Sequence, residues 1–313
     1  MSLSERNDLD GILVIDKPAG ITSHDVVARV RRLLGVKRVG HGGTLDPFAT
    51  GVLPIAVGRA TRVLQYVQSA DKGYRVTVEL GAETDTGDTE GAVVQRRTAD
   101  AANWPTRGEV DATLLRFLGE QEQIPPAHSA IKVDGEPLYR RARAGEVVDV
   151  PPRQVRVDSI DVLRYEPPLF DLEIACGKGT YIRALVRDIG RALGTYAYCS
   201  ELRRTRTGPF TLAQARTLEQ LGALDPRANW RTVALAPDAA LPELTVLTLD
   251  RASTNAWYHG RPVTLTDEQT APSGALVRVY SARGQFAGVG AVGADRRATP
   301  TFVIVPAHGE RES

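Results

Sequence analysis

The sequence predicts an α+β fold in which helices flank a mixed, largely antiparallel sheet, followed by a small all-β domain. Two observations support this prediction. Short β-prone runs are separated by helical segments without regular βαβ alternation, and only β-prone runs follow a proline-bearing connector at residues 234–244. The 313 residues are 42% hydrophobic and 25% charged, which suits a globular protein of about two domains. We therefore expect one domain over residues 1–240 and a second over residues 245–313.

Apolar spacing at the helix and strand periods predicts the elements of the first domain. The expected strands are Ile12–Ile15, Val52–Val57, Tyr74–Leu80, one beginning at Val93 and Val94, Val155–Tyr165 and Phe170–Ala175. The expected helices are His24–Leu34, Arg59–Gln68, Asp111–Leu118 and Tyr181–Leu193. Thr22 and Ser23 are suited to cap the first helix, and Gly35 is placed to end it.

Two further regions have their own character. Residues 123–152 carry five prolines and are expected to leave the core as an excursion, with a short helix near Leu138–Ala144. In the second domain, the spacing predicts strands at Leu276–Tyr280, Phe286–Val292 and Thr301–Val305.

The net charge of +1 argues against a uniformly basic nucleic-acid-binding chain, but it is the sum of unlike segments. Residues 17–62 hold eight basic and two acidic residues, and residues 178–206 hold seven and two. Residues 79–122 hold four basic and ten acidic residues. The two basic stretches could contact phosphates, and a solvated surface is the plain alternative.

The sequence also indicates where the protein works. No apolar run approaches the roughly 18 residues of a membrane span, and residues 1–10 lack the apolar core of a signal peptide. The two cysteines, Cys176 and Cys199, fit buried packing in a reducing compartment. We expect a cytoplasmic protein without membrane contact.

Several cofactor and catalytic motifs fail on inspection. Gly288–Gly293 matches G-x-G-x-x-G, but no helix is expected after it, so it is interpreted as a β turn. The histidines are scattered without metal-ligand spacing, and no G-x-S-x-G elbow occurs. We therefore expect no metal and no cofactor.

The loop Gly40–Gly51 is the remaining candidate site. Three glycines precede the lone Asp46 and allow the backbone to approach a ligand, while Pro47 fixes the turn after it. The plain alternative is a turn aspartate that bonds its own backbone.

Further motifs accompany this loop over the first 210 residues. They are Asp16-Lys17-Pro18-x-Gly20-x-Thr22-Ser23, Lys72-x-Tyr74 leading to Leu80-Gly81, Thr84-Asp85-Thr86-x-Asp88-x-x-Gly91, Ile124-Pro125-Pro126-x-x-Ser129-Ala130-Ile131-Lys132, Gly177-Lys178-Gly179-Thr180-Tyr181-Ile182-Arg183 and Leu202-Arg203-Arg204-Thr205. With them, the sequence resembles the tRNA pseudouridine-55 synthases, the TruB family. His128 stands where that family usually has Tyr, and Gly177 departs from its usual C-S-K-G-T.

The resemblance implies a pseudouridine synthase-like fold and a cofactor-independent reaction. One uridine in the tRNA T arm, at position 55, would be flipped out and isomerised to pseudouridine. Asp46 would be the catalytic carboxylate, either as a nucleophile or through a glycal intermediate. Arg183 would orient Asp46 and lower its pKa, and Tyr74 would stack on the uracil.

The same resemblance implies a set of substrate-binding residues. They are His41, Tyr181, Leu202, Lys17, Arg38, Lys132 and Lys178. Residues 123–152 would clamp the RNA, and the second domain resembles a PUA-like RNA-binding domain. We expect a monomer that needs tRNA and no protein partner. Two alternatives stay open: a non-catalytic RNA-binding protein or RNA chaperone, and a pseudouridine synthase directed by a guide RNA.

Overall fold

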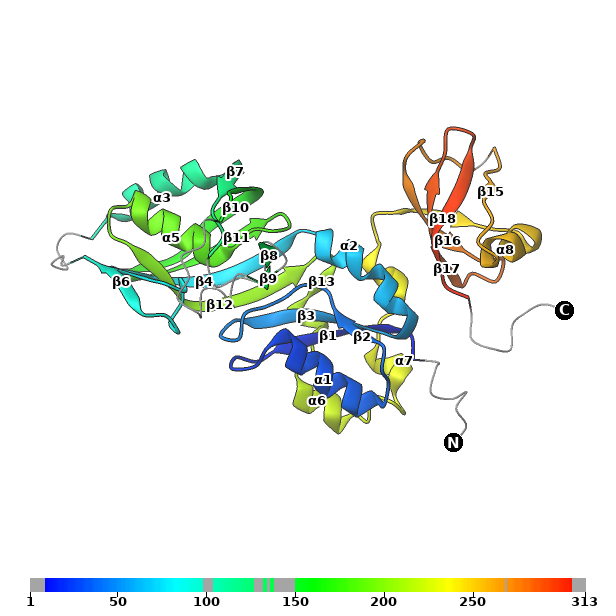
Figure 1. Ribbon diagram of the computed structural model, residues 1–313, viewed down its shortest axis with the longest axis horizontal. Coiled ribbons are helices and arrows are strands. Elements are labelled where there is room, and N and C mark those ends of the chain that lie inside the picture. Colours follow the sequence, from blue (N-terminus) through cyan, green and yellow to red (C-terminus); the bar gives the residue numbers. More distant parts are fainter. Residues whose placement is uncertain are drawn as a thin grey trace.

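The computed structural model describes residues 9–97, 104–126, 150–267 and 269–305, and the backbone of residues 132–133 and 136–137. Its largest unit is a nine-stranded sheet in the order β1-β3-β12-β4-β11-β10-β7, with β2 beside β3 and β13 beside β12 (Figure 1). The β12–β3 pair is parallel, and the other neighbours are antiparallel. The strand bounds are Gly11–Lys17 (β1), Val39–His41 (β2), Thr50–Val57 (β3), Lys72–Leu80 (β4), Gly119–Gln123 (β7), Arg153–Glu166 (β10), Leu169–Cys176 (β11), Ala197–Thr207 (β12) and Phe210–Thr211 (β13).

Helices pack beside this sheet in two groups. Their bounds are Ser23–Leu34 (α1), Leu64–Ser69 (α2), Arg107–Leu114 (α3), Ile182–Ala192 (α5), Leu218–Ala223 (α6) and Trp230–Val233 (α7). Helices α1 and α6 lie together next to β1, β2 and β3, and α3 and α5 lie together at the other end of the sheet (Figure 1). Two short hairpins complete this part: Ala82–Thr84 (β5) with Val93–Arg96 (β6), and Lys132–Val133 (β8) with Glu136–Pro137 (β9). No helix in the described part of the chain is long and apolar enough to cross a membrane.

Local sequence explains where α1 begins and ends. The Thr22 side chain accepts a hydrogen bond from the Asp25 amide, and the Asp25 carboxylate accepts one from the Thr22 amide. This capping box satisfies two amides that the first turn leaves without partners. Gly35 ends the helix in the left-handed conformation, at φ 65°.

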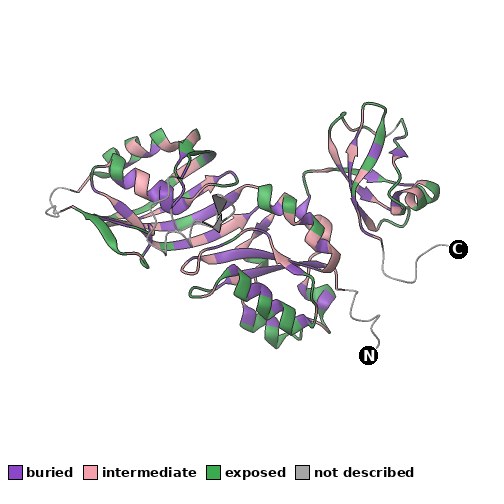
Figure 2. Ribbon diagram, viewed as in Figure 1, coloured by how far each residue is buried: buried purple, intermediate pink, exposed green. Residues whose placement is uncertain are grey.

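Strand β1 is buried on both faces, which explains its continuous apolar run. Leu13 and Ile15 belong to the main core with α1, whereas Ile12 and Val14 belong to a second apolar cluster on the opposite face. Figure 2 shows this pattern as buried central strands beneath helices with exposed outer faces.

The chain ends in a second sheet, which we call the C-terminal module. Its order is β14-β16-β17-β18-β15, with bounds Thr245–Thr248 (β14), Val263–Thr264 (β15), Leu276–Tyr280 (β16), Phe286–Val292 (β17) and Arg297–Val303 (β18). Helix α8 (Arg251–Tyr258) packs on it, and Trp257 is fully buried in the core of the module.

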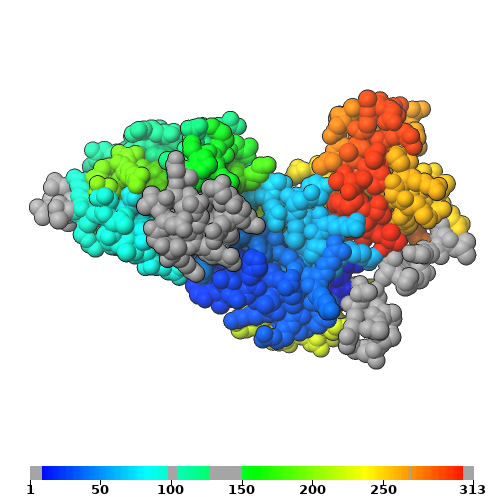
Figure 3. Space-filling view, viewed as in Figure 1, coloured from blue at the N-terminus to red at the C-terminus, as the bar shows by residue number. Residues whose placement is uncertain are grey.

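The C-terminal module packs onto the rest of the chain through the second apolar cluster. Phe302 and Ile304 of the module share that cluster with Ile12 and Val14 of β1. Arg62 donates a hydrogen bond to the Val303 carbonyl at 3.0 Å. Figure 3 shows the orange and red module against the light-blue surface that residues around 60–70 provide.

The α+β architecture with a C-terminal β module is confirmed, and its strands and main helices lie where the sequence predicts them, apart from shifts at their ends. Several features differ from the prediction, including short elements that were not predicted, such as β2, β5, β7, β14, β15 and α6. The central strand β12 was not predicted, the helix expected at Arg59–Gln68 begins as a 3-10 turn at Gly58–Val63, and the helix expected at Asp111 begins at Arg107. The module predicted to be all-β contains α8. The helix predicted near Leu138–Ala144 lies outside the described residues.

These differences have local causes. A capping box of Thr106 and Glu109 starts α3 before its apolar residues begin, so apolar spacing alone places the start too late. Strand β12 ends in the polar run Arg203–Thr207, whose charged side chains disguise a strand that lies between two others.

Candidate active site

The loop that carries Asp46 joins β2 to β3 and is held on both sides of that residue. The Ser23 hydroxyl donates to the Leu45 carbonyl at 3.2 Å and accepts from the Leu45 amide at 2.9 Å. On the other side, the Lys17 ammonium donates to the Pro47 carbonyl at 3.1 Å. The loop therefore presents Asp46 from a fixed backbone.

The Asp46 carboxylate forms an ion pair with Arg183 from helix α5, with 2.9 Å between Oδ2 and Nε. The side chain of Arg183 is only 4% exposed, and that of Asp46 is 36% exposed. Arg183 also lies 3.3 Å from Asp88 Oδ2 and donates to the Thr86 carbonyl at 2.5 Å. One buried guanidinium thus joins an accessible carboxylate to a buried one.

The electrostatic balance at Asp46 differs from the expectation. Burial raises the pKa of Asp46 above its ordinary value, and the negative charge of Asp88 adds to this rise. Arg183 lowers the pKa, as expected, but burial outweighs it and the net direction is upward. The Asp46 side chain therefore keeps 36% of its surface exposed, although protein surrounds most of its carboxylate.

Tyr74 lies on β4, directly opposite Arg204 of β12 and Ile174 of β11. It is buried, and this burial raises the pKa of its hydroxyl, which the Arg204 guanidinium partly opposes. Leu202, two residues before Arg204, is also buried and lies on the same face of β12. Tyr74 and Leu202 both belong to the core cluster that includes Leu45, the neighbour of Asp46.

Tyr181 is half-buried at the start of α5, two residues before Arg183. The Gln123 side chain holds its backbone from both sides, since it accepts from the Tyr181 amide at 2.8 Å and donates to the Tyr181 carbonyl at 3.1 Å. No side chain within the helix caps this end, so Gln123 supplies the missing acceptor.

Lys17 and His41 lie beside the Asp46 loop. The Lys17 ammonium donates to the carbonyls of Pro18, Ile21 and Pro47, and burial lowers its pKa to about 8. Because these bonds use all three of its donors, this placement favours support of the loop. His41 is half-buried and packs edge-on against His24, with 5.2 Å between the ring centroids.

The other sequence candidates lie farther out. Arg38 and Lys178 are exposed, and Arg38 donates to the Thr61 hydroxyl at 2.6 Å. Lys132 lies on β8, and its side chain is outside the described residues. The structure therefore brings Arg183, Lys17 and Tyr74 close to Asp46. It leaves Arg38 and Lys178 at the surface.

The sequence predicts no role in the site for four residues that support it: Ser23, Asp88, Gln123 and Arg204. Asp88 and Arg204 stand within the motifs of the sequence analysis. Their roles could not be predicted there, because the sequence does not show which residues they contact in the fold. Ser23 was interpreted only as a helix cap, and its bond to Leu45 spans 22 residues. Sequence spacing does not show contacts of this length.

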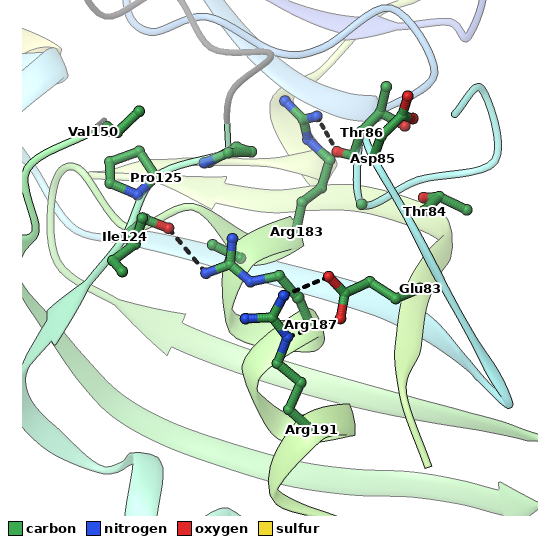
Figure 4. A pocket seen from close by; sticks show the side chains of 13 residues that line it. Glu83, Thr84, Asp85, Thr86, Ile124, Pro125, Val150, Arg183, Arg187 and Arg191 are labelled. Atoms are coloured by element: carbon green, nitrogen blue, oxygen red, sulfur yellow. Dashed lines mark hydrogen bonds and ion pairs between the residues drawn. The ribbon is translucent and has the colours of Figure 1, made fainter. Parts of the chain in front are cut away.

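A pocket of about 300 Å³ lies on the α5 side of Arg183. Arg183, Arg187 and Arg191 follow one face of the helix at intervals of four residues (Figure 4). Arg187 donates to the Ile124 carbonyl at 3.0 Å, and Arg191 forms two bonds of 2.6 and 2.8 Å to Glu83. The helix that carries Arg183 is thus tied by its own arginines to the residue that follows β7 and to β5.

Known protein families match most of this chain. Family models match in three consecutive parts: the N-terminal domain of TruB family pseudouridylate synthases over residues 31–182, the C-terminal domain of tRNA pseudouridylate synthase B over 183–235, and the C-terminal part of pseudouridine synthase II TruB over 245–304.

Individual relatives agree with these matches. tRNA pseudouridine synthase B of Pseudomonas fluorescens (strain Pf0-1) is 43% identical over 302 residues, which cover 96% of this chain and 97% of that protein. The protein of the same name from Pseudomonas aeruginosa (strain UCBPP-PA14) is 42% identical with the same coverage. Among solved structures, a chain of a Cbf5-Nop10-Gar1 complex is 27% identical with a TM-score of 0.74, and the match covers 98% of this chain and 88% of that one.

Three observations agree on one family. They are the fold, the ion pair between Asp46 on its glycine-bearing loop and Arg183 on α5, and the matches over almost the whole chain. The chain belongs to the TruB family of pseudouridylate synthases.

Proposed function

We propose that this protein isomerises one uridine of the tRNA T arm, position 55, to pseudouridine without a cofactor. The observation that carries this proposal is the 2.9 Å ion pair between the accessible Asp46 and the buried Arg183. Membership in the TruB family and relatives named tRNA pseudouridine synthase B support the substrate.

The reaction needs a carboxylate and no electron carrier. The C1′–N1 bond breaks, a C1′–C5 bond forms, C5 loses a proton and N1 gains one, so atoms and electrons balance within the nucleotide. An ionised Asp46 can attack C1′ or take a proton from the sugar, and both routes require the charge that Arg183 supports. Arg183 touches Asp46 directly and orients it for either route.

The remaining site residues are assigned to holding the base. A uridine in a folded loop must leave its stack, at a cost of a few kcal/mol. We assign Tyr74 to stack on the uracil, and Tyr181 and Leu202 to line the pocket around it. We assign His41, beside the loop, to fill the space that the extruded nucleotide leaves. The Tyr74 assignment is supported by its position opposite Arg204, which donates to the Asp46 loop. Leu202 lies on the same face of β12 as Arg204, and Tyr181 lies two residues ahead of Arg183.

Contacts with the RNA backbone would offset the cost of base flipping. Arg38 and Lys178 are exposed cations in the two basic stretches, and we assign them, with Lys132, to phosphates. The C-terminal module would extend this surface as an RNA-binding domain. We further propose that the protein acts as a monomer in the cytoplasm without a protein partner, as the relatives at 42–43% identity carry single-protein names.

A test of this function follows the position of the product. Incubate the protein with a tRNA transcript and locate pseudouridine as a carbodiimide adduct that stops reverse transcriptase. We expect one new stop, at the T-arm uridine, and none in a transcript with cytidine at that position. RNA binding without any stop would instead support a non-catalytic RNA-binding protein, and a stop that requires an added guide RNA would support the guided class.

A further inference from the structure

Arg204 is a buried cation that donates hydrogen bonds to three backbone carbonyls and lies beside the Tyr74 hydroxyl. The residue is 1% exposed, and each of its three nitrogens donates to a different acceptor. Nε donates to Val52 at 2.8 Å, Nη1 to Thr44 at 3.2 Å and Nη2 to Gly43 at 3.1 Å. Among the described residues, no carboxylate lies within ion-pair distance of this guanidinium. A buried charge without a carboxylate partner is costly, so the position of Arg204 calls for an explanation.

The three acceptors stand at the two ends of the loop that carries Asp46. Gly43 and Thr44 precede Asp46, and Val52 follows it. The backbone of Arg204 also pairs with Gly51 in the parallel β12–β3 register. Gly51 has φ 103°, and a Cβ there would lie 2.2 Å from the Arg204 carbonyl oxygen. One residue therefore contacts both the start and the end of this loop.

The same residue lies next to Tyr74. Arg204 and Tyr74 are opposite each other in the β12–β4 register, and opposite residues on neighbouring strands project to the same face of a sheet. Arg204 thus contacts both the Asp46 loop and the strand that carries Tyr74.

We propose that Arg204 is a positioning residue, which fixes the Asp46 carboxylate relative to the Tyr74 ring. This role rests on the proposed function, because it concerns the two groups that would meet the uridine. A guanidinium carries its N–H donors on three nitrogens held apart in one plane, so it can bond to both ends of the loop at once. A lysine offers its donors from a single nitrogen and cannot hold both ends in the same way. Arg204 itself does not touch the reacting atoms.

The neighbouring Arg203 provides a matched control. It lies on the same strand with its side chain on the opposite face, 40% exposed, and forms a 2.6 Å ion pair with Asp16. Compare Arg204→Lys with Arg203→Lys in single-turnover conversion of tritiated T-arm RNA, and measure RNA affinity separately. We expect Arg204→Lys to lower the rate constant by about 100-fold with RNA affinity within about threefold of the wild type. Arg203→Lys should stay within about threefold of the wild type in both.

A rescue experiment separates positioning from general stability. Arg204→Ala leaves a cavity that methylguanidinium can enter, and we expect millimolar methylguanidinium to restore the rate at least tenfold while methylammonium does not. A full rate in Arg204→Lys would overturn the proposal. So would an equal loss of RNA affinity and rate in Arg204→Ala, without rescue, because that pattern indicates only a folding defect.

Hydrogen exchange tests the same role without the reaction. The Gly42 and Ala49 amides are bonded within the loop region, to Pro54 and Asp46 carbonyls. In the RNA-free protein, we expect Arg204→Lys to speed exchange over residues 42–52 and to leave α1 unchanged. Unchanged exchange over 42–52 would overturn the positioning role. If the wild type released no tritium while this exchange result held, the proposed function would fail and the anchoring of the loop would stand.

Discussion

The pKa of Asp46 is set by opposing effects of its surroundings. Burial and the charge of Asp88 raise its pKa, and Arg183 lowers it. Activity requires the ionised carboxylate, so the rate should rise with pH as the solution passes through the pKa of Asp46. Because the net direction is upward, this acid limb should lie at a higher pH than an ordinary aspartate would give.

Replacement of Asp88 tests that balance. Asp88→Asn removes a negative charge that raises the pKa of Asp46, so the acid limb of the pH–rate profile should move to lower pH. Glu90→Gln is the control, because it removes a nearby negative charge that is not among the main causes of the Asp46 pKa shift. Single-turnover rates over the acid range provide the measurement. An acid limb that moved upward in Asp88→Asn would contradict this account.

At the residue scale, the sequence predicted which residues form the site, but it did not predict the electrostatic environment of Asp46. Asp46 and Arg183 could be proposed from motifs, because their types and positions match a family pattern. The direction of the Asp46 pKa could not, since it depends on burial by segments far apart in the chain. The partner of Arg183 on the other side, Asp88, needed the fold to bring residues 88 and 183 together.

At the scale of elements, the Asp46 loop depends on a close approach between β3 and β12. Gly51 and Gly20 both have positive φ, at 103° and 81°, but only Gly51 faces another backbone. A side chain at Gly20 meets nothing within 4 Å, whereas one at Gly51 meets Arg204. An alanine at Gly20 would therefore cause backbone strain alone, whereas an alanine at Gly51 would also collide with the backbone of Arg204.

We expect Gly20→Ala to lower the free energy of unfolding by about 1–2 kcal/mol, which is the cost of the left-handed conformation. Gly51→Ala should lower it by more than about 3 kcal/mol, because a displaced strand adds to that cost. Urea unfolding of both variants measures the difference. Equal losses would show that Arg204 does not constrain the loop at Gly51.

Elements with a clear apolar period could be predicted, and those fixed by tertiary contacts could not. Helix α1 has one apolar face and a capping box, so its bounds follow from local sequence. Strand β12 supplies Leu202 and Arg204 to the site, yet its charged residues conceal it. Its place between β3 and β4 satisfies its backbone on both edges, which no local pattern reveals.

At the scale of the whole molecule, the C-terminal module is part of a shared apolar cluster. Val289 and Phe302 pack with residues of β1 and β3 on the face of the sheet opposite the main core. The connector at residues 234–244 was predicted as a link between domains, and it also contributes the buried Ala240 and Leu241 to this cluster. An interface of this kind has no sequence period, so it could not be anticipated.

Phe302→Ala should weaken that interface. The Phe302 ring is 8% exposed and lies 6.3 Å from the Tyr66 ring, centroid to centroid. Loss of a buried phenylalanine costs about 3–5 kcal/mol, so we expect a lower thermal midpoint and separate melting of the module in calorimetry. Val246→Ala, at a position 51% exposed in the same module, should change stability by less than about 0.5 kcal/mol. A single unshifted transition in Phe302→Ala would contradict a shared core.

The central claim is that the Asp46 carboxylate performs the isomerisation. Its most direct measurement is tritium release from T-arm RNA labelled at uridine C5, for the wild type, Asp46→Asn and Asp71→Asn. Asp71 is the control because its carboxylate forms a surface ion pair with Arg156. The account predicts release by the wild type and Asp71→Asn, and a loss of roughly a thousandfold or more in Asp46→Asn with RNA binding retained. Equal release by the wild type and Asp46→Asn would contradict it.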